Sequence, residues 1–223
     1  MRGLHEAVEA AVAARRPSAA SSVRLGHVDV EQPDVPATLA TLAPGEPAVV
    51  VPLLLSAGYH VHVDLTEAVE AEADRTVVLA GALGPDDRLV TVLLRRLHEA
   101  GLRDGDHVVL AVAGSSDVRA VEHCRDMAAR LAEASGRDIS LGFLSAAEPS
   151  LPDAVAAARR DAADGERVVV ANYLLAPGYF DRLAMRAGAD VTARPLLLPD
   201  EPAPTELVDI VLDRYAEASA PLG

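Results

Sequence analysis

An internal repeat limits the folds open to this chain more than any other feature of its sequence. The segment LGHVDVEQPDVP at 25–36 aligns with LGFLSAAEPSLP at 141–152, and VVPLLLSAGYH at 50–60 aligns with VANYLLAPGYF at 170–180. The two alignments run in the same order, at offsets of 116 and 120 residues. Two generic strand–turn–helix units would not be expected to share both the order and the offset. The sequence therefore predicts two copies of one folding unit.

Each copy alternates short apolar runs with segments of helical spacing. The run at 48–55 is rich in Val and Leu, as is a strand buried on both faces, whereas 86–100 carries Leu89, Leu93 and Leu97 on one helical stripe. This alternation predicts an α/β fold of two tandem flavodoxin-like units with parallel sheets. The polar Asp104-Gly105-Asp106 segment predicts a boundary between an N-terminal domain, 1–103, and a C-terminal domain, 104–223.

The two copies differ at their beginnings. At the offset of 116, Asp117 aligns with Met1, so the strand and turn VVLAVAGSS at 108–116 have no counterpart in the first copy. We expect the first unit to lack its opening strand, although a strand is still predicted at 23–30. A parallel sheet without a central strand would contain unpaired backbone groups and an apolar slot.

Composition excludes several classes of function. The chain has 34 acidic and 20 basic residues and a formal net charge of −14, which disfavours binding to nucleic acid or to an anionic membrane surface. The single cysteine, Cys124, rules out an intramolecular disulfide and lacks the setting of a nucleophile. Neither a membrane span nor a signal peptide is recognisable. We expect a cytoplasmic protein, monomeric or homodimeric, with no nucleic-acid or membrane partner.

The most informative single stretch is the end of the 48–55 run. A small-residue turn at 56–58 follows it, and then come Tyr59, His60, His62 and Asp64. Ligands of open parallel sheets bind at the carboxyl ends of strands, which is where these residues are expected. In a helix His60 and Asp64 would share a face. A lone histidine at such a turn is more often a surface residue than a ligand.

At PLLLSAGYHVHVD, 52–64, the sequence resembles the sirohydrochlorin chelatases, and Gly58-Tyr59-His60 with Asp64 is similar to that family's Gly-x-His-x-x-x-Asp motif. The resemblance implies a lyase that inserts cobalt or ferrous iron into sirohydrochlorin, an anionic tetrapyrrole, in cobalamin or sirohaem biosynthesis. The divalent metal is then a substrate, and no organic cofactor is implied.

The resemblance also implies roles for five residues. His60 would be a metal ligand and the catalytic proton acceptor, and Asp29 the assisting acid, although an aspartate in that place can instead cap a helix. Asp64 would be a further metal ligand, although it could instead support the ligands without touching the metal or be a charge on the helix face. Gly58 and Tyr59 would bind the substrate.

The second copy has Ala113, Ser145 and Phe180 where the family has a histidine, an acid and a histidine. One site per chain is therefore implied, in the first copy. In the family, the first strand ends in a His-Gly-Ser/Thr turn that belongs to the site. The first copy begins after that point, so an alternative is a non-catalytic protein that binds tetrapyrrole or metal and has lost half of its chelatase site.

Overall fold

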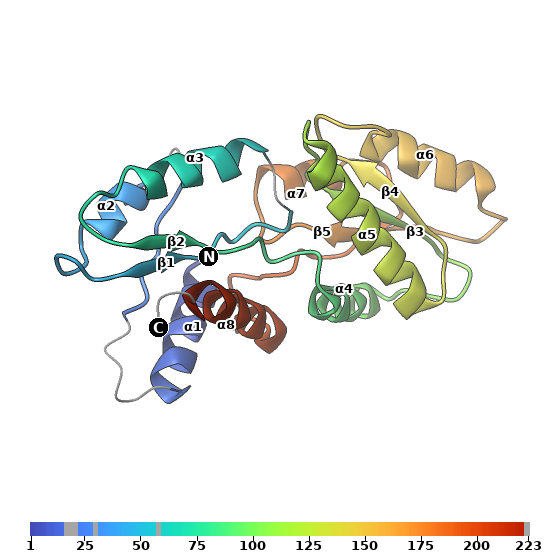
Figure 1. Ribbon diagram of the computed structural model, residues 1–223. Coiled ribbons are helices and arrows are strands. Elements are labelled where there is room, and N and C mark those ends of the chain that lie inside the picture. The colour runs from blue at the N-terminus through green and yellow to red at the C-terminus, as the bar shows by residue number, and fades with distance from the viewer. Residues whose placement is uncertain (16–21, 29–30, 57–58, 221–223) are drawn as a thin grey trace.

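The computed structural model describes residues 1–15, 22–28, 31–56 and 59–220, without the side chains of 15 and 59–64. Its first half contains α1 (Arg2–Arg15), α2 (Val35–Leu39), β1 (Ala48–Val50), α3 (Tyr59–Glu70), β2 (Val77–Leu79) and α4 (Asp87–Glu99) (Figure 1). Its second half contains β3 (His107–Val112), α5 (Val118–Ser135), β4 (Ile139–Phe143), α6 (Leu151–Asp161), β5 (Val168–Tyr173), α7 (Tyr179–Ala184), β6 (Val191–Thr192) and α8 (Thr205–Ser219).

The described strands form two parallel sheets. The second half has the order β4-β3-β5-β6, and the first half pairs β1 with β2. The predicted α/β fold with parallel sheets is confirmed. The sheet of the second half is covered on one face by its own α5 and by α4 from the first half, and on the other face by α6 and α7 (Figure 1). Its central strands are consequently buried on both faces, which explains their continuous apolar sequences.

Backbone hydrogen bonds recur at equivalent places in the two halves. The first half has Ala80 N–H donating to Val50 C=O at 2.8 Å and Leu83 N–H to Leu54 C=O at 2.8 Å, and the second has Ala193 to Val170 at 2.9 Å and Leu196 to Leu174 at 3.0 Å. The sequence repeat is therefore also a repeat of strand and loop geometry.

The predicted strand at 23–30 is wrong for the residues that the structure describes. Within 22–28, His27 forms an isolated bridge to Asp34, and no longer ladder is present. The equivalent β4 is a strand because it pairs with β3 along its length, from Ile139 to Phe143. Among the described residues of the first half, no strand corresponds to β3. The segment at 22–28 thus lacks the neighbour that would make it a strand.

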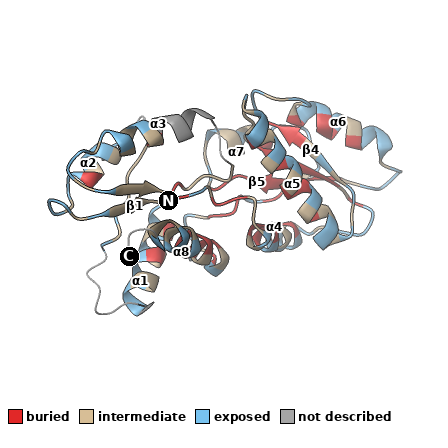
Figure 2. Ribbon diagram, viewed as in Figure 1, coloured by how far each residue is buried: buried red, intermediate tan, exposed pale blue. Residues whose placement is uncertain are grey.

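The strands of the two sheets differ in how far they are buried. β5 is buried throughout and β3 almost throughout, whereas β1 and β2 are half-buried (Figure 2). The first sheet is therefore less well covered than the second.

The last helix of each half packs on the other half. Helix α4 contacts α5 and β5, and α8 contacts α1, β1 and β2 (Figure 1). Leu89 and Leu93 of α4 and Leu207 and Ile210 of α8 lie in one hydrophobic core and are at most 1% exposed. The two halves therefore share a core through exchanged helices.

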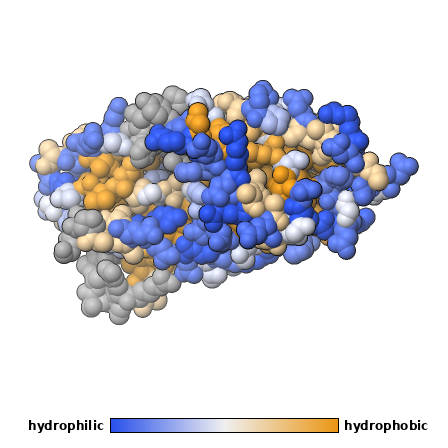
Figure 3. All heavy atoms as spheres, turned by 45° about the vertical axis from the view of Figure 1, so that its right-hand side comes forward, coloured by the Kyte–Doolittle hydropathy of each residue, from blue (hydrophilic) through white to orange (hydrophobic). Residues whose placement is uncertain are grey.

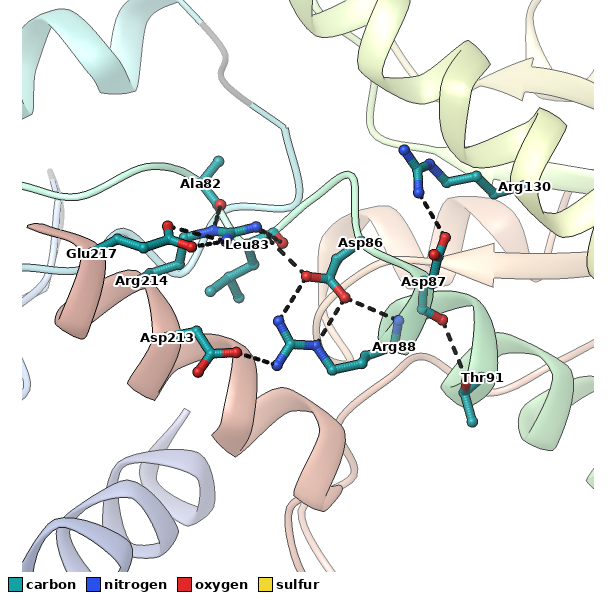
Figure 4. A network of polar contacts seen from close by, with 10 residues as sticks. All are labelled: Ala82, Leu83, Asp86, Asp87, Arg88, Thr91, Arg130, Asp213, Arg214 and Glu217. Carbon is teal, nitrogen blue, oxygen red and sulfur yellow. Dashed lines mark hydrogen bonds and ion pairs between the residues drawn. The ribbon is translucent and has the colours of Figure 1, made fainter. Parts of the chain in front are cut away.

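A polar network holds the beginning of α4 in place (Figure 4). Asp86 caps the helix and accepts hydrogen bonds from the Arg88 guanidinium at 2.9 Å, while Arg88 also pairs with Asp213 of α8 at 2.6 Å. Arg130 of α5 pairs with Asp87 at 2.6 Å. Burial raises the pKa of Asp86, but the hydrogen bonds from Arg88 outweigh this and lower it overall. The carboxylate therefore stays charged as the helix cap.

A second ion pair joins the beginnings of β3 and β5. Arg167 donates to the two carboxylate oxygens of Asp106 at 3.1 and 2.5 Å, and the Asp106 side chain is 3% exposed. The hydrogen bond from Arg167 lowers the pKa of Asp106 below its ordinary value. Its carboxylate therefore stabilises the fold above the unfolded-state pKa of about 3.9, and this contribution is lost as the pH falls through the lower folded-state value.

We expect Asp106→Asn to reduce the free energy of unfolding by about 1–3 kcal/mol at pH 7, because Arg167 loses its charged acceptor. The difference from the unsubstituted chain should shrink as the pH falls from about 5 to about 2. Urea unfolding at several pH values measures it. If the variant and the unsubstituted chain differed in stability by the same amount at pH 7 and at about pH 2, the charge of Asp106 would not be the cause.

The face seen in Figure 3 is largely hydrophilic with separate apolar patches, in keeping with the net charge of −14. None of the helices in the described ranges combines the length and apolar character that crossing a membrane requires.

Candidate active site

The predicted corner lies at the carboxyl end of β1. The strand ends at Val50, and α3 begins at Tyr59. His60 and Asp64 are therefore one helical turn apart in the backbone of α3. The side chains of Tyr59, His60 and Asp64, and the whole of Gly58 and Asp29, lie outside the described part of the chain. Their roles remain predictions.

The second half holds the chain leading into this corner. Tyr173, at the end of β5, donates its hydroxyl to the C=O of Leu55 at 3.1 Å. Its side chain is buried, and burial raises its pKa well above the ordinary value, so the hydroxyl remains a donor. The segment that follows β1 therefore contacts the carboxyl end of β5. The candidate site lies at the junction of the two halves, a place where ligand sites are common.

Gly84 packs directly against both residues of this contact, Tyr173 and Leu55. A Cβ atom at Gly84 would overlap the Tyr173 hydroxyl oxygen and lie 2.5 Å from the Leu55 carbonyl oxygen. The absence of a side chain at Gly84 lets Leu55, in the segment after β1, approach Tyr173 at the end of β5.

The second half shows the geometry of the equivalent positions. Ser145 donates its hydroxyl to the C=O of Ala113 at 2.9 Å, so the ends of β3 and β4 are adjacent. Gly114 has a φ of 91°, and a Cβ there would overlap the carbonyl oxygen of Ser145. Phe180 packs edge to face on Tyr179, with ring centroids 5.5 Å apart. Ala113, Ser145 and Phe180 provide neither imidazole nor carboxylate.

Sequence reasoning missed Asn172, which is fully buried in β5. Its Nδ2 donates to Asp181 Oδ1 in α7 at 2.8 Å, and its own Oδ1 finds no hydrogen-bond partner among the described residues. The equivalent residue of the first half is Pro52. A lone amide within the run VVVANYLL was the available signal. Asn172 holds α7 against the end of β5.

The described residues form neither a metal site nor a reactive cysteine. No group of three or more His, Cys, Asp or Glu side chains among them is arranged to hold a metal ion. Cys124 is buried, and burial raises the pKa of its thiol to about 11, so it is protonated near neutral pH. The metal ligands that the resemblance implies, His60 and Asp64, have side chains outside the described part of the chain.

A protein-family model, CbiX, matches the chain twice, at residues 2–100 and 107–193. The two matches reproduce the internal repeat and together include most of the chain. Among curated proteins, none matches this chain.

Solved structures of similar fold include two of SirB. SirB from Bacillus subtilis with Fe³⁺ superposes with a TM-score of 0.72 at 19% identity, covering 100% of this chain and 92% of its own. The sirohydrochlorin chelatase SirB from Bacillus subtilis subspecies spizizenii, in complex with cobalt, gives 0.66 at 16% identity, with 100% and 91% covered.

A third similar structure is a multi-domain protein from Deinococcus radiodurans. It is described as having structural similarity to chelatases and two additional novel domains. Its TM-score is 0.62 at 16% identity, covering 97% of this chain and 50% of that protein. At these identities, the three structures establish the fold.

Proposed function

This chain belongs to the CbiX family of sirohydrochlorin chelatases, and from this membership we propose that it inserts a divalent metal ion into sirohydrochlorin. The observation that carries the proposal is the family match across both repeats. The SirB structures with Fe³⁺ and with cobalt support iron or cobalt as the metal. Either metal would suit a place in sirohaem or cobalamin biosynthesis.

The proposed chemistry needs a metal ligand and a proton acceptor, because insertion displaces two pyrrole N–H protons. A neutral imidazole serves both tasks near neutral pH, and we assign them to His60. Asp29 would orient the imidazole or take up a proton, and Asp64 would be a further metal ligand. Gly58 and Tyr59 would contact the tetrapyrrole.

The place of the corner supports this assignment. The hydrogen bond from Tyr173, at the end of β5, to Leu55 holds the chain that leads into the corner against the second half. A large planar substrate bound there could contact both halves.

Metal insertion can be followed by the absorbance of sirohydrochlorin on addition of Co²⁺ or Fe²⁺ to the chain. We expect turnover above the uncatalysed rate, and the relative rates would identify the preferred metal. A bound and spectrally shifted tetrapyrrole without insertion would instead establish the alternative, a binding protein without catalysis.

A further inference from the structure

A cavity of about 950 Å³ lies in the first half, between residues 22–28 and β1. Apolar side chains line both of its faces. Leu4 and Val8 of α1 and Val211 and Leu212 of α8 contribute to one face, and Leu39 of α2 and Leu65 of α3 to the other. The cavity therefore lies within the plane of the first sheet, between its covering helices.

The second half shows what occupies the equivalent space. There β3 lies between β4 and β5 and pairs with both. Residues 25–27 correspond to the end of β4, and β1 corresponds to part of β5. The cavity thus corresponds to the position of one strand, β3.

The edge of β1 that faces the cavity carries free strand-pairing groups. Ala48 N–H donates to Thr76 C=O at 3.0 Å, and Val50 C=O accepts from Ala80 at 2.8 Å, so these two residues turn toward β2. Because successive residues of a parallel strand turn to opposite edges, Val49 and Val51 present their N–H and C=O groups to the cavity. No described strand pairs with them there.

The beginning of α1 borders the cavity. Met1 lines the cavity, and its C=O accepts from His5 N–H at 3.1 Å. In the second half, Asp117 C=O accepts from Val121 N–H, also at 3.1 Å. Asp117 follows β3 after the turn at 113–116. A strand lying in the cavity parallel to β1 would therefore end within one short turn of Met1.

We propose that this cavity is a binding site for one β-strand, a continuously apolar segment of about the length of β3 that runs parallel to β1 and leads through a short turn into Met1. Both faces of the cavity are mostly apolar, so we expect a segment that is apolar on both of its faces and not merely at alternate positions. Its backbone would bond with Val49 and Val51, as in recognition by strand addition. The proposal does not rest on the proposed metal insertion.

The test is to place a copy of the chain's own segment GDHVVLAVAGSS, 105–116, ahead of Met1. The matched control carries Leu110→Pro in the added copy, which removes a backbone donor and disfavours a central strand. Amide hydrogen exchange at Val49 and Val51, binding of a dye specific for exposed apolar surface and the thermal midpoint are compared with those of the unextended chain.

We expect the extension to slow exchange at Val49 and Val51 on the order of tenfold or more, to lower dye binding and to raise the midpoint. The proline control should behave like the unextended chain. Unchanged exchange, or equal protection by the control, would overturn the proposal. The same segment is also added as a free peptide to the unextended chain, and protection of Val49 and Val51 by the peptide but not by the extension would overturn the connection to Met1.

Discussion

Replacing His60 with alanine should lower the rate of metal insertion into sirohydrochlorin by about 10²–10⁴-fold, the range typical of a lost general base. The variant would lack both the proposed metal ligand and the proposed proton acceptor. Since His60 lies in the first turn of α3 and alanine favours helices, the free energy of unfolding should change little. Initial rates of insertion and urea unfolding, measured on the same preparations, separate the two effects.

His62→Ala is the matched control, because His62 lies in the same helix but outside the family motif. We expect it to keep nearly the full rate of insertion. If His60→Ala retained most of the activity, or if both variants lost it equally, the assignment of His60 would be wrong. Asp29→Asn should have a smaller effect, of about 10–100-fold, since Asp29 is proposed to act through the imidazole.

Gly84→Ala should reduce the free energy of unfolding by about 1–3 kcal/mol or more, the usual effect of overpacking. The new methyl group would overlap the hydroxyl of Tyr173 and lie 2.5 Å from the carbonyl oxygen of Leu55. Neither neighbour has room to move, because Tyr173 is buried and the other atom belongs to the backbone. Urea unfolding measures the loss.

Gly81→Ala in the same loop is the control, because its Cβ would lie 3.9 Å from its nearest neighbour, Arg214 Cδ. We expect no more than a small effect there. Combining Gly84→Ala with Tyr173→Phe should recover part of the loss, since the second change removes the overlapping oxygen. Equal stabilities of the two alanine variants would show that the junction is less tightly packed than described.

The sequence predicted those helices and strands whose formation depends on the spacing of neighbouring residues. The stripe of Leu89, Leu93 and Leu97 predicted α4, and all three leucines are at most 1% exposed. The repeat predicted two parallel α/β units, because the same strand and turn residues recur at a nearly constant offset. The cavity followed from the missing counterpart of β3.

Features that depend on distant partners were not predictable in this way. An apolar run becomes a strand only beside another strand, and 22–28 has no described counterpart of β3 to pair with. An apolar stripe shows that α4 and α8 are buried, but not that each lies on the sheet of the other half. The choice of His60 came from family resemblance, since a histidine at a turn has many ordinary roles.

Helices α4 and α8 each pack on the other half of the same chain, so the contact between the two halves does not depend on protein concentration. Two separate single-copy proteins that exchanged these helices would form a symmetric pair, which dilution would dissociate. Here residues 100–106 connect α4 directly to β3, so the two partners belong to one molecule. Short tethers of this kind give effective concentrations in the millimolar range. The contact between Tyr173 of the second half and Leu55 of the first is therefore retained even when the protein is scarce.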